Sequence, residues 1–77
     1  MDTFKELQSI IATYFKIESQ LIQLKTTAKD ISDWDSFSHM DLMSTIEKHF
    51  ETTFPFTVLM DFSCVGDINE YLINQQQ

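Results

Sequence analysis

Hydrophobic residues recur at helical spacing in the first part of the chain and gather on one face of a predicted helix. The residues on that face are Phe4, Leu7, Ile10, Ile11, Tyr14, Phe15 and Ile17. Polar residues take the opposite side, so the pattern predicts an amphipathic helix from Thr3 to Lys16 that buries one face. Thr3 and Glu6 have the spacing of a capping box, which would start this helix.

The next segment, residues 17–35, has no sustained helical period. A loop this long is uncommon in a small domain and is usually functional or held down by apolar side chains. Five apolar residues could serve as such anchors, namely Leu21, Ile22, Leu24, Ala28 and Ile31.

A second helix is predicted to begin at Asp35 or Ser36, either of which can cap it, and to end near Phe50. One face of this helix forms an apolar arc of Leu42, Met43, Ile46 and Phe50, with His39 in its middle. Ser36 lies at the edge of the arc, and the outward side carries Phe37, Met40, Asp41, Ser44 and Glu47. An exposed serine bordered by apolar side chains and carboxylates resembles a docking surface.

Two further helices are predicted in the last third of the chain. Pro55 suits the first turn of a short helix. Ser63 or Cys64 would precede a last helix with Val65, Ile68, Tyr71 and Leu72 on one face. The sum is an all-α fold, a small up-down bundle of three main helices plus one short helix. We expect a single domain over residues 1–77, with 73–77 as a frayed tail.

Charge and composition narrow the classes of partner. The 77 residues include 12 acids and 5 basic residues, for a net charge of −7, and six acids but one lysine lie between Asp30 and Glu51. Such a chain repels nucleic acid and anionic membranes and favours basic partners. A single cysteine, Cys64, and the lack of a signal peptide or membrane span predict a soluble, cytoplasmic protein, which we expect to be a monomer.

Catalysis is a poor fit to the sequence. Asp35, Ser36, His39 and His49 supply the residue types of a serine hydrolase. His39 points into the apolar arc, however, and His49 is roughly 20 Å along the helix from the serine. No glycine-rich elbow offers an oxyanion hole, so we expect a protein that is not an enzyme.

A metal site is also not expected. Asp33 and Asp35 begin like a calcium-binding loop, but Phe37 stands at a ligand position, Ser38 at the glycine position and Ser44 at the position of the closing glutamate. A solvated acidic loop is the better interpretation.

Three stretches form a recognisable combination: DSF at 35–37, MDLMSTIEKHF at 40–50 and SCVGDINEYL at 63–72. In this order, and in a chain of this length and acidity, they resemble the acyl carrier proteins of bacterial fatty-acid, polyketide and related pathways. The family's signature at the first stretch is Asp-Ser-Leu. The resemblance covers nearly the whole chain.

The resemblance implies that a phosphopantetheinyl transferase attaches 4′-phosphopantetheine from coenzyme A to the Ser36 hydroxyl. The thiol of that arm would carry acyl groups as thioesters, and the transferase with its metal would supply the chemistry. Acyl-loading and acyl-processing enzymes with basic patches would then dock nearby. The docking positions implied by the family are Asp35, Phe37, Met40, Asp41 and Glu47.

The chain departs from the family pattern at several places. Two residues before the aspartate, where the family often has glycine, this chain has Asp33, followed by Trp34. The WDS form resembles a subset from specialised pathways. Ser38, Ser44 and Lys48 replace positions that are commonly acidic or large and apolar.

The third helical segment, PFTVLMDF, is far more apolar than the family's usual acidic version. We expect it to help form an acyl pocket or a partner surface, with candidates Met43, Phe54, Phe56, Leu59, Met60 and Phe62. The alternative is a shifted helix that buries most of these side chains, so burial of Phe56, Leu59 and Met60 together would exclude an exposed surface.

Two other functions remain open from the sequence. A carrier of the same fold could be loaded with an amino acid or aryl acid by an adenylating enzyme. A small helical interaction module could instead keep Ser36 unmodified and bind a partner helix through its apolar third segment. Cargo, chain length and pathway are not determined by the sequence.

Overall fold

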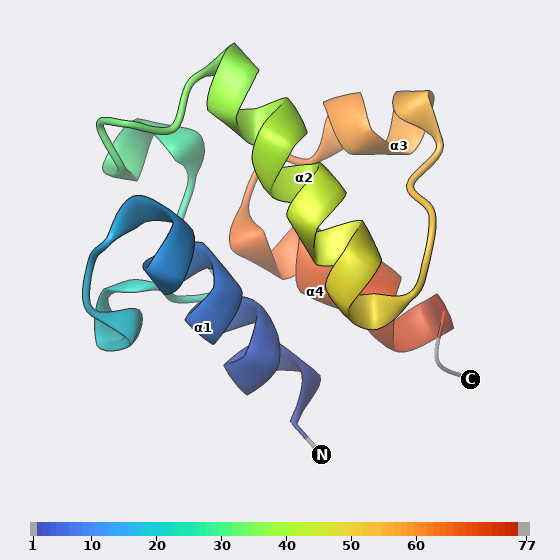
Figure 1. Ribbon diagram of the computed structural model, residues 1–77, viewed down its shortest axis with the longest axis horizontal. Helices are drawn as coiled ribbons and strands as arrows, with labels where there is room; N and C mark the ends of the chain where they lie inside the picture. The colour runs from blue at the N-terminus through green and yellow to red at the C-terminus, as the bar shows by residue number, and fades with distance from the viewer. Residues whose placement is uncertain (1, 76–77) are drawn as a thin grey trace.

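Residues 2–75, described by a computed structural model, form four α-helices and two 3₁₀ turns (Figure 1). In chain order these are α1 (Thr3–Phe15), η1 (Ser19–Leu21), η2 (Ala28–Asp30), α2 (Ser36–Phe50), α3 (Phe56–Asp61) and α4 (Val65–Gln75). No strand occurs between residues 2 and 75. The predicted all-α bundle of three main helices and one short helix is confirmed.

The N-cap of helix α1 is Asp2, one residue before the predicted cap, Thr3. The carboxylate of Asp2, not a capping box of Thr3 and Glu6, accepts the backbone N–H groups of Phe4 and Lys5. The helix ends at Phe15 because Lys16 adopts a left-handed conformation with φ 58°, and its N–H closes the last turn. The predicted span is correct to one residue, but the predicted cap is wrong.

The segment between α1 and α2 is held by fewer apolar side chains than expected. Ile22 is fully buried and Ile31 is half-buried, but Leu21, Leu24 and Ala28 are exposed. The prediction of five anchors is therefore wrong for three of them. Short-range patterning could not distinguish them, because the η1 and η2 turns rotate neighbouring side chains to different sides of the segment.

Backbone hydrogen bonds with the start of α4 also hold the segment between α1 and α2 in place. The carbonyl of Thr26 accepts the N–H of Val65 at 2.8 Å, and that of Leu24 accepts the N–H of Gly66 at 2.7 Å. These bonds satisfy N–H groups at the start of α4 that have no partner within the helix. A Cβ at Gly66 would lie 3.0 Å from the Leu24 carbonyl oxygen, so only glycine allows this close approach without a shift.

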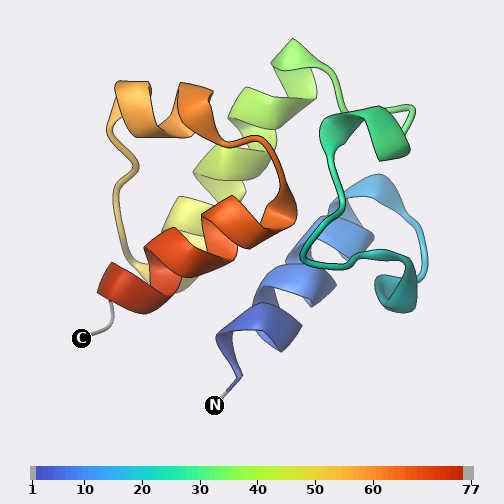
Figure 2. The ribbon, with the colours of Figure 1, turned by 180° about the vertical axis from the view of Figure 1, so that it is seen from behind.

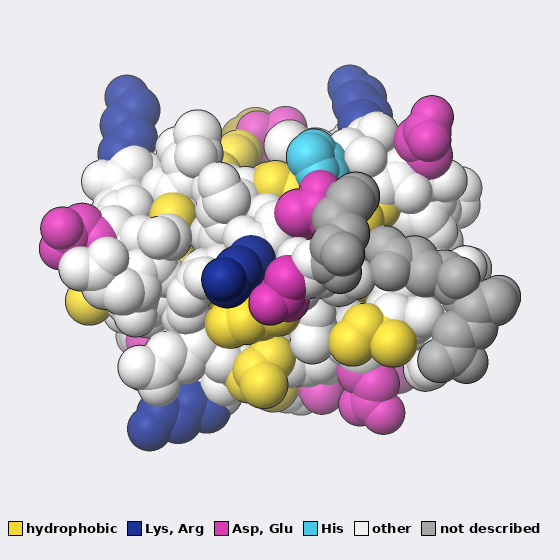
Figure 3. Space-filling view, turned by 90° about the horizontal axis from the view of Figure 1, so that it is seen from below, with side chains coloured by type: hydrophobic (Ala, Val, Ile, Leu, Met, Phe, Trp, Pro, Cys, Tyr) yellow, Lys and Arg dark blue, Asp and Glu magenta, His cyan; other side chains and the backbone are white. Residues whose placement is uncertain are grey.

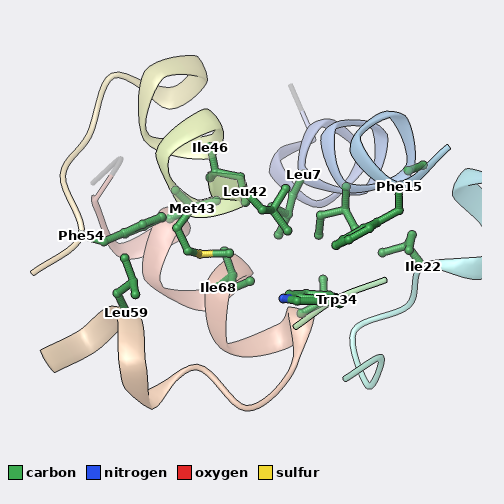
Figure 4. Packing of buried hydrophobic residues seen from close by; sticks show 14 residues of the cluster. Leu7, Phe15, Ile22, Trp34, Leu42, Met43, Ile46, Phe54, Leu59 and Ile68 are labelled. Atoms are coloured by element: carbon green, nitrogen blue, oxygen red, sulfur yellow. The ribbon is translucent and has the colours of Figure 1, made fainter. Parts of the chain in front are cut away.

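One continuous core joins the long segment to all four helices. It consists of Leu7, Ile11, Ala12, Phe15, Ile22, Trp34, Leu42, Met43, Ile46, Phe54, Leu59, Val65, Ile68 and Leu72. In Figure 4, Trp34 lies near Phe15 and Ile22 at one end of this core, while Phe54 and Leu59 lie near Met43 at the other. The arc predicted for the second helix supplies three of these side chains.

The chain termini lie at the end of the bundle away from the start of α2, as the two opposite views show (Figures 1 and 2). Seen from below, near the termini, basic and acidic side chains are interspersed in small groups (Figure 3). Helix α4 continues to Gln75, so residues 73–75 are helical rather than frayed, and 76–77 lie outside the described residues. No helix within residues 2–75 has the length and apolar character needed to span a membrane.

Candidate functional site

Ser36 is the first residue of α2, and its side chain is exposed. Within residues 2–75 its hydroxyl makes no hydrogen bond. The preceding residue, Asp35, is extended and acts as the cap, accepting the Ser38 N–H at 2.9 Å. The Ser38 hydroxyl in turn accepts the Asp35 N–H at 2.8 Å. This reciprocal capping box fixes where the helix starts and leaves the Ser36 hydroxyl directed to solvent.

Asp35 is held in its charged form beside the serine. Hydrogen bonds from the backbone and then the hydroxyl of Ser38 lower the pKa of the Asp35 carboxyl below its ordinary value. The serine at the first turn of α2 therefore has a carboxylate on one side and backbone N–H groups, which carry partial positive charge, on the other.

An open groove of about 520 Å³ lies between the start of α2 and α3. It is lined by Ala28, Trp34, Asp35, Ser36, His39, Met40, Phe56, Met60 and Phe62, and is called the Ser36 groove below. Most of these side chains are apolar. Ser36 is therefore one of the residues that line a predominantly apolar groove.

The candidates for an acyl pocket or partner surface divide into two groups. Phe56 and Met60 are 66% and 58% exposed and, with half-buried Phe62, line the Ser36 groove. The other three, Met43, Phe54 and Leu59, are buried in the core and do not line the groove. Because Phe56 and Met60 are exposed, the joint burial of Phe56, Leu59 and Met60 that would exclude an exposed surface does not occur.

The two apolar positions expected beside the serine are both exposed. Phe37 is 83% exposed and Met40 is 41% exposed. Met40 also lines the Ser36 groove, whereas Phe37 does not. Both side chains are on the first turns of α2, next to Ser36.

Asp41, the second predicted docking acid, is exposed on α2 and accepts a 2.7 Å hydrogen bond from the hydroxyl of Tyr14 on α1. This bond, followed by desolvation of the phenol and by the nearby charges of Asp41 and Asp35, raises the pKa of Tyr14. Asp41 therefore serves the packing of two helices as well as the surface charge.

Glu47, the third predicted docking acid, is half-buried. Its carboxylate accepts the backbone N–H of Phe54 at 2.7 Å and so holds the segment that leads from α2 to α3. One of its two oxygens is thus engaged within the protein. The three acids lie on α2 or at its cap, but each also makes an internal hydrogen bond.

Neither histidine makes a hydrogen bond to the serine hydroxyl within residues 2–75. Both ring nitrogens of His39 are engaged, one with the Trp34 indole at 3.0 Å and one with the Leu59 carbonyl at 3.1 Å. His49 pairs with Glu6 of α1 at 3.2 Å, near the far end of α2. Residues 2–75 contain no group of three or more His, Cys, Asp or Glu side chains that could hold a metal ion.

Sequence reasoning missed the Trp34–His39 and Tyr14–Asp41 pairs. The first pair is five residues apart and the second joins two helices, so neither follows a helical repeat. The capping box of Asp35 and Ser38 did have a sequence signal, namely two cap-forming residues three apart before an apolar run.

Comparisons with known proteins agree on one family. A family model described as a phosphopantetheine attachment site matches residues 5–72. The acyl carrier protein of Onion yellows phytoplasma (strain OY-M) is 29% identical over 69 residues, which are 90% of this chain and 91% of that protein. The acyl carrier protein of Phytoplasma australiense is 28% identical over 68 residues, covering 88% and 90%.

A solved structure gives the same result. The solution NMR structure of a holo acyl carrier protein from Geobacter metallireducens superposes with a TM-score of 0.87 and 32% identity, covering 99% of this chain and 87% of that one. Because the family model spans most of the sequence and the fold agrees, this chain belongs to the acyl carrier protein family, whose members are carriers rather than enzymes and bear a phosphopantetheine prosthetic group.

Proposed function

We propose that the Ser36 hydroxyl is the attachment point of the 4′-phosphopantetheine group, which a phosphopantetheinyl transferase transfers from coenzyme A. The observation that carries this proposal is the exposed hydroxyl of Ser36, free of internal hydrogen bonds within residues 2–75, at the first position of α2. Ser38, two residues on, differs because its hydroxyl is engaged in the capping box. Enzymatic loading followed by mass measurement tests the proposal.

The surroundings of Ser36 fit the attached group. A phosphate on this hydroxyl would lie at the N-terminus of a 15-residue helix, where the unpaired N–H groups and the helix dipole favour negative charge. When bound, the group supplies a thiol at the end of a flexible arm, on which an acyl chain is carried as a thioester. Ser36 needs no base of its own, because the transferase provides one.

The Ser36 groove is the proposed site for the acyl chain. Its walls are formed by Trp34 and Met40 on one side and by Phe56, Met60 and Phe62 on the other. Burying an apolar chain against such side chains is favourable, by about 25 cal/mol for each Å² removed from water. This lining favours an apolar acyl cargo over a charged aminoacyl cargo, which would lose its hydration there.

The proposed docking surface consists of Asp35, Phe37, Met40, Asp41 and Glu47. The exposed carboxylates of Asp35 and Asp41 would attract basic patches on the transferase and on acyl-loading and acyl-processing enzymes. Phe37 and Met40 would supply the apolar contact at the centre, as their exposure allows. The carrier would dock as a monomer and exchange between enzymes, because such contacts are weak.

Affinity for the transferase measured at increasing salt concentration tests this docking surface. We expect binding to weaken steadily between about 50 and 500 mM salt, since screening shortens the range of exposed charges. Affinity that did not fall with salt would contradict docking through these acids.

The proposed pathway is one of fatty-acid, polyketide or specialised biosynthesis. A cytoplasmic location stays a prediction, which rests on the single cysteine, Cys64.

A further inference from the structure

His39 connects two segments that form opposite sides of the Ser36 groove. The indole nitrogen of Trp34, in the segment that leads into α2, lies 3.0 Å from Nδ1 of His39. Nε2 of the same ring lies 3.1 Å from the carbonyl oxygen of Leu59 on α3. The rings of Trp34 and His39 are also stacked, with centroids 6.0 Å apart and planes inclined by 23°. One imidazole therefore joins the segment, α2 and α3.

These partners determine the protonation state of His39. An indole nitrogen can only donate a hydrogen bond, so Nδ1 of His39 must accept from Trp34. In a neutral imidazole the other nitrogen then carries the hydrogen, and Nε2 donates it to the Leu59 carbonyl. The arrangement requires the neutral ring in this one tautomer.

Helix α3 depends on outside support. It has only six residues, and isolated helices of this length are not stable in water. Leu59 is one of the last four residues of α3, whose carbonyl groups find no N–H donor within the helix. His39 satisfies that carbonyl, while α3 presents the exposed side chains of Phe56 and Met60 to the Ser36 groove.

We propose that neutral His39 is a positioning residue that pins α3 across the Ser36 groove and thereby sets the width available to the acyl chain. The use of the groove by the acyl chain rests on the function proposed above, whereas the pinning of α3 does not. His39 touches neither the serine hydroxyl nor any reacting atom. It acts through Trp34 and through the Leu59 carbonyl.

Proton uptake by His39 would release this pin. A hydrogen on Nδ1 would face the indole N–H of Trp34 at 3.0 Å, so two donors would oppose each other. The rigid ring would have to turn, and this would draw Nε2 away from the Leu59 carbonyl. Two other titratable groups line the cavities that contain His39 within the described chain: the Asp35 carboxylate in the Ser36 groove, and the Cys64 thiol in a small cavity behind it.

The test uses the unloaded Ser36→Ala protein, so that it does not depend on modification. Hydrogen-exchange protection factors of α3 amides are compared between pH 7.5 and pH 5.5 by NMR, together with the single indole N–H resonance of Trp34. The ring resonances of His39 report its protonation directly. We expect α3 protection to fall by about tenfold once these resonances show proton uptake, the factor expected for one lost hydrogen bond, while the indole resonance shifts.

Three variants in this background isolate His39. The amide of His39→Gln can still accept and donate but does not titrate, so α3 protection should not change with pH. Trp34→Phe removes the indole donor together with part of a buried ring, and α3 protection should already be low at pH 7.5. His49→Gln is the matched control, because His49 pairs with Glu6 far from α3, and it should respond to pH as the parent does.

Protection of α3 at pH 7.5 that is equal in the parent and in His39→Leu would overturn the proposal. So would a fall that persists in His39→Gln, or one that disappears in His49→Gln. A loaded protein gives the second readout: attachment of an octanoyl group should shift the methyl resonance of Met60, and His39→Leu should alter that shift. Failure of loading would contradict the proposed function but leave the exchange result on His39 intact.

Discussion

The hydroxyl of Tyr14 on α1 donates a 2.7 Å hydrogen bond to the carboxylate of Asp41 on α2. Asp41 is also one of the acids proposed to meet basic partners. A partner's lysine or arginine would therefore compete with Tyr14 for the same carboxylate. Packing of the first two helices and recognition are coupled through this one group.

Loss of this bond should appear in the alkaline titration of the two tyrosines. The pKa of Tyr14 is raised in the folded protein, chiefly by the bond to Asp41, so the bond stabilises the fold below about pH 10 and is lost as pH rises through the raised value. In Asp41→Ala, the transition of Tyr14 should move to lower pH when followed by ultraviolet absorbance. Unchanged transitions would show that the bond is absent in solution.

The acid at Glu47 can be tested for structure and charge separately. Glu47→Ala leaves the Phe54 N–H without its acceptor, and should lower the free energy of unfolding by about 1–3 kcal/mol in chemical denaturation. Glu47→Gln keeps an oxygen for that N–H and should cost less, while it removes the charge. If both variants weaken transferase binding equally, the lost charge rather than the lost hydrogen bond is responsible. Equal stability of the two would contradict the role given to this hydrogen bond.

The cap at Asp35 predicts a defined pH dependence of stability. Because its pKa is lowered in the folded state, its contribution is complete above the ordinary value of 3.8 and is lost as pH falls through the lower, folded value. The difference in unfolding free energy between wild type and Asp35→Ala should be constant from pH 7 to about pH 5 and narrow below 3.8. Asp35→Asn is the control, because its amide oxygen can still accept the Ser38 N–H but does not titrate, so its stability difference from Asp35→Ala should not narrow below pH 3.8. A difference in unfolding free energy between wild type and Asp35→Ala that did not narrow at low pH would contradict capping by the carboxylate.

Truncation of Met43 should lower the free energy of unfolding far more than truncation of Met60. Met43 is fully buried, so Met43→Ala should cost about 2–5 kcal/mol of unfolding free energy through lost contacts and the cavity it leaves. Met60 is 58% exposed, and Met60→Ala should change stability by less than about 0.5 kcal/mol. Met60→Ala should nevertheless alter the environment of a bound acyl chain, which fluorescence of an acyl-linked probe would detect. A large stability loss in Met60→Ala would contradict its place on the groove wall.

Helix positions followed from the sequence because each main helix carries a clear apolar face. The starts of α2 and α4 and the end of α2 at Phe50 agree with the pattern, as does the exposure of Ser36. Met43 shows the limit of this reasoning. A helical wheel places it in the apolar arc, and the structure buries it in the core beside Phe54 and Leu59 (Figure 4), so it does not line the Ser36 groove as the pocket prediction required.

The groove and its two sides could not be predicted from periodicity. Trp34 follows no helical repeat, yet it is buried against Phe15 and its indole N–H donates a hydrogen bond to His39. The third segment has too many apolar residues for the core, and only the angle of α3 decides that Phe56 and Met60 remain outside. These features depend on contacts between segments far apart in the sequence, which local spacing does not encode.

Intact mass after incubation with a broad-specificity phosphopantetheinyl transferase and coenzyme A tests the central claim most directly. Wild-type protein and Ser38→Ala should each gain one phosphopantetheinyl group, because the Ser38 hydroxyl serves the cap rather than attachment. Ser36→Ala should gain none while remaining folded by circular dichroism. A gain in Ser36→Ala, or no gain in folded wild-type protein, would contradict attachment at Ser36.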